Sequence, residues 1–364
     1  MSAIVRKIFI SAGEPSGDLY GSLIAKELLA IDQSLEISCI GADQLKESGV
    51  NVIRNSQDLT TFGFYEGIKN YWRIKKIYQE VSDYLDSFRP DIFLPIAFGG
   101  FNLKLARSMK KNKTKIVYFA PPQLWAWGKW RTKELRKNTD KVICLFPFEE
   151  KFFQDLGVKA IYLGNPLLDY IESQANKPAA VLNRIPKDSK IITFMPGSRK
   201  EEIARHLPLM LEIFQKLRDE IVEVYGLVII DKSYSLPKID NLFFTEEEKY
   251  QIMANSNLIV LSSGTASLEA AILGVPHIAV YRLSLPTYLI ARALVKIRRF
   301  SLPNIILQED IIPEFIQPKL PDLYPVVIKL ISSPNSIMKQ KLSKVKEVLI
   351  RPGAISRIAE QILS

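Results

Sequence analysis

The segment that decides the fold reads Leu258-Ile259-Val260-Leu261-Ser262-Ser263-Gly264-Thr265-Ala266-Ser267-Leu268-Glu269-Ala270-Ala271-Ile272-Leu273-Gly274-Val275-Pro276. Its apolar beginning predicts a buried strand, and its small residues predict a turn that opens a helix. We expect that helix to stop at Gly274, in the position after the C-cap, because Pro276 cannot continue it. A strand, a turn and a helix in this order form the βα unit of a parallel sheet.

The same alternation of short apolar runs and longer amphipathic segments extends along the whole chain, without an internal repeat or low-complexity tract. It predicts an α/β protein with mainly parallel sheets. The predicted strands are Lys7–Ser11, Ile37–Gly41, Ile92–Ile96, Lys115–Phe119, Lys141–Leu145 and Ala160–Leu163, then Lys190–Met195, Gly226–Ile230, Asn257–Leu261 and His277–Tyr281.

The pattern lapses between about Gly164 and Asp188, which suggests a passage between domains. Since 364 residues exceed the usual size of one hydrophobic core, we expect two doubly wound domains, residues 1–167 and 168–340. The final helix, expected from about Ser336 to Ser364, is predicted to cross back to the first domain over residues 340–364. The carboxyl ends of the two sheets would then face a central cleft, where ligands bind in such folds.

The composition is that of a folded globular protein, since 47% of the residues are hydrophobic and 24% are charged. Lys and Arg total 49 against 39 Asp and Glu, and the formal charge of +10 predicts an anionic partner. That partner is nucleic acid, a phosphorylated small molecule or an anionic membrane surface.

Two cysteines without metal-ligand spacing, Cys39 and Cys144, predict a reducing compartment. The apolar run from Ile8 to Ala12 is too short for a signal peptide, and no run of about 20 apolar residues could span a bilayer. We therefore expect a cytoplasmic location. For the two histidines, His206 and His277, a packed or solvated role is expected over catalysis.

The turn Ser263–Ala266 is the first candidate site. Small side chains there let a phosphate approach backbone N–H groups at a helix N-terminus, where the helix dipole also favours an anion. Glu269, about one turn into the helix, is placed to accept hydrogen bonds from ribose hydroxyls. The alternative is an ordinary βα turn with a Ser or Thr N-cap and a solvated Glu269.

A second strand, turn and helix lie upstream, with Pro196-Gly197-Ser198-Arg199 between the strand and a helix that begins near Lys200. A cation at a helix start is unfavourable for the helix alone, which suggests a site. The guanidinium of Arg199 suits a pyrophosphate. The alternative is a surface Arg199 paired with Glu201 or Glu202.

The segment from Gly13 to Asp18 has the same form in the first domain. Gly13 and Gly17 with Glu14, Ser16 and Asp18 would form a polar pocket at the carboxyl end of a strand. For Asp18 the alternative is a capping role on a helix from Leu19 to Ala30.

Taken in order along the chain, a set of motifs resembles the lipid-A-disaccharide synthase family over nearly its whole length. The motifs are Ala12-Gly13-Glu14-Pro15-Ser16-Gly17-Asp18, Trp125-Ala126-Trp127, Pro196-Gly197-Ser198-Arg199 with Glu202-Ile203, Ser263-Gly264-Thr265-Ala266 with Glu269, Tyr281-Arg282, Ser301-Leu302-Pro303-Asn304 and Pro313-Glu314-Phe315-Ile316-Gln317. Each is weak alone, and the ordered set is specific.

The resemblance implies a GT-B glycosyltransferase of two Rossmann-like domains. It implies inverting, metal-independent transfer of 2,3-diacylglucosamine from UDP to the 6-hydroxyl of 2,3-diacylglucosamine 1-phosphate, without a cofactor. The C-terminal domain would bind the UDP-sugar and the N-terminal one the acceptor. The residues expected at the donor are Gly197, Ser198, Arg199, Ser263, Gly264, Thr265, Ala266, Glu269 and Asn304; those expected at the acceptor are Gly13, Ser16 and Gly17.

The sequence departs from the family at its acceptor side. Where the family has Asp-Ala-Pro-Asp-Phe-Asn, this chain reads Ala97-Phe98-Gly99-Gly100-Phe101-Asn102, and the family's Gly-His-Pro is Gly164-Asn165-Pro166. The first missing Asp is the family's usual candidate for the general base that takes the acceptor proton. We therefore expect Glu66, Asp18 or Glu14 to supply the base or to bind the acceptor.

Two segments mix aromatic and basic residues. Residues 64–78, with Lys69, Arg73 and Lys76, and residues 285–300 are typical of helices that lie on an anionic membrane. The alternative is a helix packed on its own sheet with a solvated basic face. Together with an acylated acceptor, the segments predict peripheral association with the inner membrane; a homodimer is left open.

Three other functions compete with this interpretation. Nucleic-acid binding is disfavoured because no RNA-binding motif occurs. A diverged relative that binds a UDP-sugar, but uses another acceptor or is non-catalytic, would fit the missing acids. A nucleotide-sugar epimerase could use the same fold.

Overall fold

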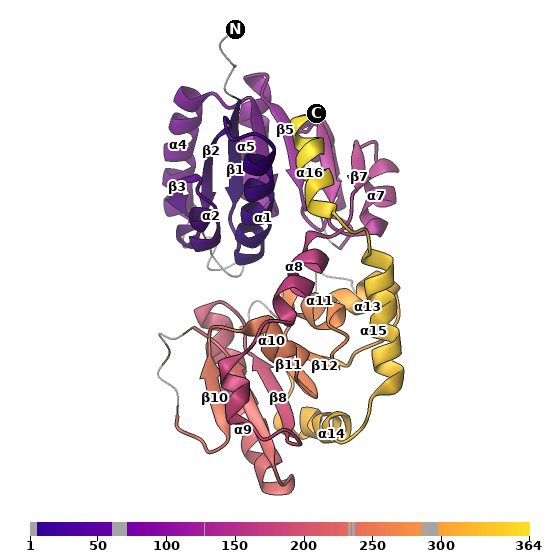
Figure 1. Ribbon diagram of the computed structural model, residues 1–364. Helices are drawn as coiled ribbons and strands as arrows, with labels where there is room; N and C mark the ends of the chain where they lie inside the picture. Colours follow the sequence, from indigo (N-terminus) through magenta and orange to yellow (C-terminus); the bar gives the residue numbers. More distant parts are fainter. Residues whose placement is uncertain are drawn as a thin grey trace. The chain divides into compact units, whose positions relative to one another are not determined.

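The computed structural model of the protein describes residues 6–59, 71–126, 128–231, 234, 237–284, 288 and 298–364. These residues form two compact units, each built on its own parallel sheet (Figure 1). The first unit contains the described residues up to 166 together with 351–364, and the second contains the described residues between 167 and 350. The expected α/β class with two Rossmann-like units is confirmed.

The first unit has a sheet of seven described strands in the order β3-β2-β1-β4-β5-β6-β7. All neighbouring strands are parallel, and their apolar residues are buried on both faces, which explains the continuous apolar runs in the sequence. The strands are β1 (Lys7–Ala12), β2 (Glu36–Gly41), β3 (Asn51–Asn55), β4 (Ile92–Ile96), β5 (Lys115–Phe119), β6 (Lys141–Cys144) and β7 (Ala160–Tyr162).

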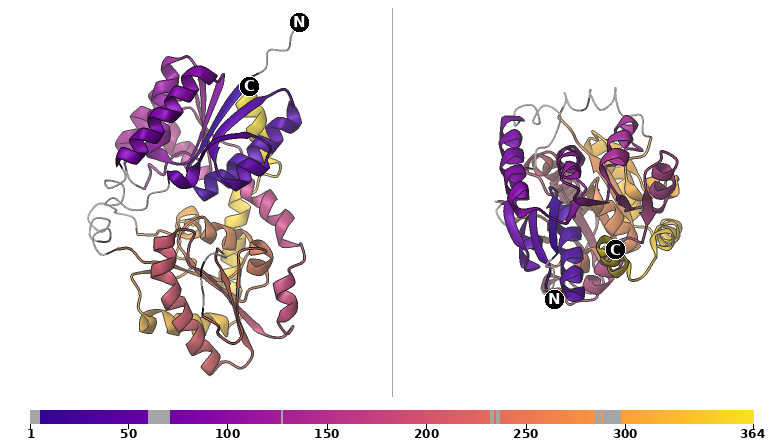
Figure 2. Two further views of the ribbon diagram at one scale, coloured as in Figure 1. Left: turned by 90° about the vertical axis from the view of Figure 1, so that its left-hand side faces the viewer. Right: turned by 90° about the horizontal axis from the view of Figure 1, so that it is seen from above.

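Helices cover both faces of this sheet, as Figure 2 shows. Right-handed crossovers place helices that connect strands in opposite directions along the sheet on opposite faces. One layer has α1 (Pro15–Ile31), α2 (Asp43–Glu47) and α16 (Ala354–Leu363), and the other has α4 (Tyr71–Phe88), α5 (Gly99–Lys111), α6 (Thr132–Asn138) and α7 (Pro147–Gln154). Short 3₁₀ turns lie at η1 (Ser56–Asp58) and η2 (Lys129–Arg131).

The last helix of the chain, α16, lies beside α1 in Figure 1. Its inward side chains, including Ile358 and Ile362, are fully buried. Two arginines tie the segment to the sheet: Arg351 donates to the carbonyl of Tyr162 at 2.6 Å, and Arg357 donates to that of Leu163 at 2.9 Å. The C-terminal segment is therefore a built-in part of the first unit.

The second unit has a sheet of six described strands in the order β10-β9-β8-β11-β12-β13. Here α9 and α14 share one apolar core on one face, while α11, α13 and α15 pack together. The strands are β8 (Lys190–Met195), β9 (Val224–Ile229), β10 (Leu242–Thr245), β11 (Leu258–Ser262), β12 (His277–Tyr281) and β13 (Glu314–Ile316). The helices are α8 (Pro166–Ala175), η3 (Ala180–Arg184), α9 (Lys200–Glu220), α10 (Lys249–Ala254), α11 (Thr265–Ile272), α13 (Leu302–Leu307), α14 (Leu320–Ile331) and α15 (Ser336–Leu349).

Both sheets reverse their strand order at one point. In the first sheet the chain builds outward from β1 to β3 and then returns to the other side of β1 with β4; in the second it does so between β8 and β11. Ligands of doubly wound folds bind outside the carboxyl ends of the strands at this switch point. The three predicted turns follow β1, β8 and β11, so all three lie at a switch point.

Every predicted strand is present within two residues of its expected bounds. The single final helix expected from about Ser336 to Ser364, however, is wrong. The chain forms α15 and α16 instead, because Pro352 lacks the amide hydrogen that a helix needs and Gly353 turns with a φ of +72°. The helix expected from Leu19 to Ala30 begins earlier, at Pro15.

Candidate functional site

The candidate site of the second unit lies where the turns after β8 and β11 leave neighbouring parallel strands. A side chain at Gly197 is sterically excluded, because its Cβ atom would lie 2.6 Å from Oε2 of Glu202 and 3.2 Å from Oγ of Ser262. Gly197 also has a φ of +118°, a conformation that favours glycine. The turn at Gly197 thus lies against both the Glu202 carboxylate and Ser262, the last residue of β11 before the predicted turn 263–266.

The N-terminus of α11 is open to solvent. Gly264 has a φ of +153° and a ψ of −153°, which only glycine adopts readily, and no atom lies within 4 Å of the position its Cβ would take. The flanking Ser263, Thr265 and Ala266 are half-buried. Since the first N–H groups of a helix have no partner within it, this end can receive an anion. The expected C′ position of Gly274 is confirmed by its φ of +69°.

Arg199 is the residue before the first turn of α9 and is paired with a carboxylate of that turn. Its Nη1 lies 3.1 Å from Oε1 of Glu202, and its side chain is 26% exposed. This is one of the two ion pairs that the alternative interpretation named. The pair also holds the guanidinium beside the Gly197 turn, with Ser198 exposed next to it.

Glu269 is a buried carboxylate with protein partners on both oxygens. Oε1 accepts a hydrogen bond from the hydroxyl of Tyr250 at 3.1 Å, and Oε2 lies 2.5 Å from Nζ of Lys249. Glu269 is only 2% exposed, so the alternative interpretation of a solvated glutamate is wrong. Its expected contact with ribose hydroxyls remains a prediction.

The side-chain amide of Asn304 likewise forms hydrogen bonds within the protein through both its nitrogen and its oxygen. Its Nδ2 donates to Glu314 and to the carbonyl of Ile312, and its Oδ1 accepts from the amides of Ile311 and Ile312. Glu314 also accepts hydrogen bonds from Phe300 and Ser301. Asn304 thus ties α13 to the segment that follows it, while Glu314 holds the segment that leads into α13. A direct contact of Asn304 with the donor nucleotide remains a prediction.

This segment is joined to the α11 turn by hydrogen bonds. Oγ of Ser263 donates to the carbonyl of Phe300 at 3.2 Å, and the amide of Leu302 donates to Oγ of Ser267 at 3.3 Å. Ser267 in turn donates to the carbonyl of Gly264 at 2.9 Å. The network fixes the open N-terminus of α11 against the start of α13.

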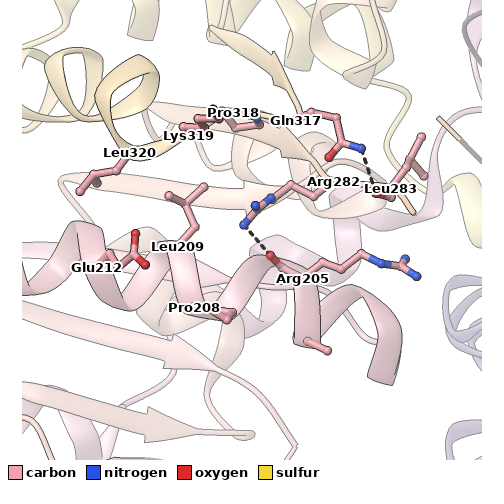
Figure 3. A pocket seen from close by; sticks show the side chains of 11 residues that line it. Arg205, Pro208, Leu209, Glu212, Arg282, Leu283, Gln317, Pro318, Lys319 and Leu320 are labelled. Carbon is pink, nitrogen blue, oxygen red and sulfur yellow. Dashed lines mark hydrogen bonds between the residues drawn. The ribbon is translucent and has the colours of Figure 1, made fainter. Parts of the chain in front are cut away.

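Beyond this turn, at the carboxyl ends of β12 and β13, lies a cavity of about 550 Å³ (Figure 3). Arg282 donates from Nη1 to the carbonyl of Arg205 on α9 at 2.9 Å, and Nε2 of Gln317 donates to the carbonyl of Leu283 at 2.8 Å. The cavity also contacts Pro208, Leu209, Glu212, Pro318, Lys319 and Leu320. Two motifs of the sequence, at Tyr281-Arg282 and at Gln317, therefore meet in one wall.

In the first unit, the turns after β1 and β4 also touch. A Cβ atom on Gly13 would lie 2.4 Å from the ring of Phe98, so only glycine fits there. Ala97 and Phe98 have φ values of +48° and +49°, a left-handed conformation that non-glycine residues adopt at a cost of about 1–3 kcal/mol. Strain of this kind often marks functional sites, and here it lies at the switch point of the first sheet.

Asp18 has a capping role, but on another helix than expected. Its two carboxylate oxygens accept hydrogen bonds from the amides of Ala42 and Gln44, at 2.5 and 3.0 Å, at the start of α2. Burial raises the pKa of Asp18, although these hydrogen bonds oppose the rise. A carboxylate held in this way is poorly placed to take a proton from a substrate.

Of the two other acidic candidates, Glu14 lies within the described residues and Glu66 does not. Glu14 is half-buried at the N-cap position of α1, and no described side chain forms an ion pair with it. Ser16 is half-buried, and Gly17 is buried; a Cβ atom added to Gly17 would lie 3.5 Å from that of Ala12, an ordinary contact distance. Glu66 lies outside the described residues, as do residues 64–70 and most of residues 285–300.

The positions of the family's two missing acids lie at the start of α5. Gly100 is exposed, with no atom within 4 Å of where its Cβ would be. The carbonyl of Ala97 accepts hydrogen bonds from Tyr118 at 2.7 Å and from Asn102 at 3.0 Å. Asn102, which the family motif retains, is fully buried and also exchanges hydrogen bonds with Ser11. Hydrogen bonds therefore hold the loop at the start of α5 in place, although the two carboxylates of the family motif are absent from it.

One buried acid of the first unit had no role in the sequence interpretation. Glu149 is 1% exposed and accepts hydrogen bonds from Trp125 Nε1 at 3.0 Å and from the amides of Leu145 and Phe146 at 3.0 and 3.1 Å. Burial raises the pKa of Glu149 to about 7, against the effect of these bonds. Its position three residues after the N-cap of α7 is the sequence signal that could have identified it.

Two negative findings apply to the residues that the structure describes. None of the helices in this part of the chain is long and apolar enough to cross a membrane. No three side chains of His, Cys, Asp or Glu gather there as a metal site would require.

Comparison with known proteins agrees with the motifs. The model of the lipid-A-disaccharide synthetase family matches residues 8–354. The lipid-A-disaccharide synthase of Sulfurihydrogenibium sp. (strain YO3AOP1) is 35% identical, and the alignment covers 98% of each chain. That of Persephonella marina is 32% identical, again with 98% of each chain covered.

Among solved structures, a Staphylococcus aureus MnaA–UDP complex has a TM-score of 0.70 at 14% identity, covering 98% of this chain and 96% of that one. A UDP-GlcNAc 2-epimerase from Neisseria meningitidis bound to UDP-GlcNAc has a TM-score of 0.68 at 13% identity, covering 98% and 99%. The glycosyltransferase of kitacinnamycin has a TM-score of 0.66 at 12% identity, covering 99% of each. At such low identity these likenesses concern the fold alone, which epimerases and glycosyltransferases share.

Proposed function

This chain belongs to the lipid-A-disaccharide synthase family of UDP-sugar glycosyltransferases, and from that premise we propose how its two units divide the reaction. The second unit binds UDP-2,3-diacylglucosamine, and the first binds 2,3-diacylglucosamine 1-phosphate. The 6-hydroxyl oxygen of the acceptor attacks the anomeric carbon with inversion, a base takes the hydroxyl proton, and UDP leaves with the electrons of the broken C–O bond.

The observation that carries the donor assignment is the meeting of the β8 and β11 turns at the switch point of the second sheet. The open end of α11 at Gly264 offers N–H groups to the pyrophosphate, and the guanidinium of Arg199 neutralises the charge that UDP gains as it leaves. Glu269 is fixed by Lys249 and Tyr250 in one orientation, which suits a carboxylate that accepts from ribose hydroxyls. Gly197, Ser198, Ser263, Thr265 and Ala266 complete the proposed donor site.

For the acceptor side we propose Glu14 as the base or as the group that orients the acceptor hydroxyl. Both carboxylate oxygens of Asp18 accept hydrogen bonds from amides at the start of α2, whereas the half-buried Glu14 has no described ion-pair partner. Glu14 lies at the carboxyl end of β1, beside the Phe98 turn where the family has its acids. Gly13, Ser16 and Gly17 shape this end of the strand.

The test is turnover of purified protein with UDP-diacylglucosamine and the monosaccharide phosphate, followed as UDP release and disaccharide formation. Full turnover in Arg199→Ala would contradict the donor assignment. Glu14→Gln should lower kcat about 10²-fold or more, as expected for loss of a general base, and the matched control Glu150→Gln should not.

A diverged relative without the family reaction is the alternative that the same assay decides. It would bind UDP with no disaccharide formed, since Ala97 and Gly100 replace the family's acids. Product formation that survives Glu14→Gln, Asp18→Asn and Glu66→Gln together would remove all three of our candidate bases.

We also propose that the protein associates peripherally with the cytoplasmic face of the inner membrane, where its acylated substrates reside. The exposed Trp72, with Arg73, Lys75 and Lys76 at the start of α4, supports this proposal through its chemistry: an aromatic ring among cations suits the headgroup region of anionic lipids. We expect neither nucleic-acid binding nor a requirement for a metal or cofactor; whether the protein forms a homodimer is a question for sedimentation.

A further inference from the structure

His206 lies in the second turn of α9 and bridges two turns that are far apart in the sequence. Its Nδ1 lies 3.0 Å from the carbonyl oxygen of Pro196 and 2.8 Å from that of Glu202. Its Nε2 lies 2.9 Å from the backbone nitrogen of Arg282. The imidazole is 1% exposed, so water does not compete for these contacts.

These partners allow one protonation state of the ring. The backbone nitrogen of Arg282 can only donate, so Nε2 must accept and must be unprotonated. The two carbonyls can only accept, so Nδ1 carries the hydrogen. The tautomer is thus inferred from the partners, and a doubly protonated ring would set Nε2–H against the Arg282 amide.

The bridge spans the donor site. In the second sheet β11 lies between β8 and β12, and strands of a sheet are about 4.8 Å apart. Pro196 follows β8 and Arg282 follows β12, while the open turn of Gly264 follows β11 between them. His206 therefore links the two turns that flank the Gly264 turn.

The contacts of His206 also lead to Arg199, whose guanidinium is expected to bind the pyrophosphate. Glu202, whose carbonyl accepts from His206, pairs through its carboxylate with Arg199 and packs against Gly197. On the other side, the side chain of Arg282 returns to α9 through the carbonyl of Arg205. One imidazole thus connects α9, the β8 turn and the β12 turn.

We propose that His206 is a positioning residue of the nucleoside-diphosphate site, which fixes the separation of the β8 and β12 turns and so holds Arg199 in place for the pyrophosphate. The inference rests on the proposed donor site and adds a residue that neither the motifs nor the family comparison assign. It requires a neutral imidazole. Burial, with a smaller contribution from the Arg282 charge, lowers the pKa of His206, while Glu202 and the carbonyl of Pro196 oppose this. Arg205 and Tyr281, which directly precede His206 and Arg282 in the sequence, are also ionisable.

The experiment measures UDP affinity by calorimetry and the KM for donor and acceptor separately. His206→Phe keeps a ring but loses both hydrogen bonds, and we expect UDP affinity to fall about 3- to 10-fold or more. His206→Gln offers an oxygen to the Arg282 amide and should recover part of that loss. Donor KM should rise in His206→Phe with acceptor KM unchanged, because only the donor turns are displaced.

The matched control is His277, the other histidine of the chain. It is also fully buried in the second unit, but it lies at the amino end of β12, with Nδ1 2.8 Å from the carbonyl of Val275. His277→Phe should therefore lower the melting temperature without changing UDP affinity. A pH series adds a second readout: because burial lowers the pKa of His206, the affinity ratio of wild type to His206→Gln should stay constant down to pH 6.5 and decrease only at lower pH, where His206 becomes protonated.

The outcomes separate this inference from the donor site itself. If wild type binds UDP and folded His206→Phe binds it equally well, the positioning role is wrong and the donor site stands. If wild type fails to bind UDP, both are wrong. Equal losses in His206→Phe and His277→Phe would reduce the effect to general destabilisation and overturn the inference; should His206→Phe not fold, His206→Gln and the pH series decide.

Discussion

For Asp18, measurements of stability and of turnover can distinguish a structural role from a role in catalysis or substrate binding. Its carboxylate accepts from two amides at the start of α2, and Asp18→Asn would turn an NH₂ group toward one of them. A buried unsatisfied donor costs about 1–3 kcal/mol. We expect chemical denaturation to show that loss while kcat of the folded variant stays within about twofold of wild type.

The control for Asp18 is Asp43, an exposed acid in the first turn of the same helix. Asp43→Asn removes a favourable charge near the helix N-terminus, worth about 0.3–1 kcal/mol. If Asp18→Asn instead lost its turnover at unchanged stability, Asp18 would join Glu14 as a candidate base.

Glu149 gives the first unit a dependence of stability on pH. Burial raises its pKa from 4.5 to about 7, so between these values the folded protein keeps a proton that the unfolded chain has released. The contribution of Glu149 to stability is therefore present below pH 4.5 and is lost as the pH rises through about 7. At 1.36 kcal/mol per pKa unit the loss is on the order of 3 kcal/mol.

Urea unfolding of Glu149→Gln at pH 5 and pH 8 measures this effect. Gln cannot ionise, so the difference in unfolding free energy between variant and wild type should shift in favour of the variant by about 2–3 kcal/mol between these pH values. Glu150→Gln, one position along α7, should show no such shift. Parallel pH profiles for wild type and Glu149→Gln would contradict the assignment.

At the scale of elements, the sequence predicted the inner strands and the edge strand β7, and missed the other three edge strands among the described residues. β3, β10 and β13 are all edge strands, and each contains half-buried or exposed residues where inner strands have continuous apolar runs. An edge strand needs neither two apolar faces nor two neighbours, so its pattern is short and mixed. A continuous apolar run therefore predicts a strand, and edge strands with a short mixed pattern are missed.

The turns of the candidate site were predictable because small residues after an apolar run have a local signature. The groups that hold these turns were not predictable, since their partners are remote: Asp18 reaches residues 24 and 26 positions later, and His206 reaches one 76 positions later. Which of these residues meet depends on the order of the strands in the sheet. The sequence pattern alone does not reveal that order, because a βα unit can join a sheet on either side.

The start of α4 is the element on which the membrane proposal depends. Trp72 is 73% exposed, and Lys75 lies over its ring with Nζ 5.1 Å from the ring centre. Each basic residue near an anionic surface contributes about 1 kcal/mol to binding. A Lys75→Glu/Lys76→Glu variant should therefore bind phosphatidylserine vesicles at least 10-fold more weakly in a flotation assay.

The comparison for α4 is a double reversal on another helix. Lys339→Glu/Lys344→Glu changes the net charge by the same amount at exposed positions of α15. If both variants lost vesicle binding equally, the attraction would come from net charge alone and the α4 surface would have no special role.

At the scale of the whole molecule, the stability of the first unit depends on the last residues of the chain. Ile358 of α16 is fully buried, whereas Ile350, at the end of α15, is 50% exposed. Ile358→Ala should lower the unfolding free energy by about 2–5 kcal/mol, and the same change at Ile350 should cost less than about 1 kcal/mol.

Hydrogen exchange locates the effect of Ile358→Ala. Peptides from α1 and β1 should lose protection, while peptides from β8 and α9 keep it, because α16 packs within the first unit only. A uniform loss across both units would mean that the two unfold as one.

The return of α16 to the first unit also sets an order of events during protein synthesis. The seven described strands of the first sheet are all translated by residue 162, yet the helix that packs on α1 is translated only with residues 354–363. Residues 167–350 are complete before that, so the half translated later can reach its native state first. Until α16 has been translated, the first unit exposes the apolar strip that α16 covers, and a nascent chain stalled near residue 350 would be a substrate for chaperones.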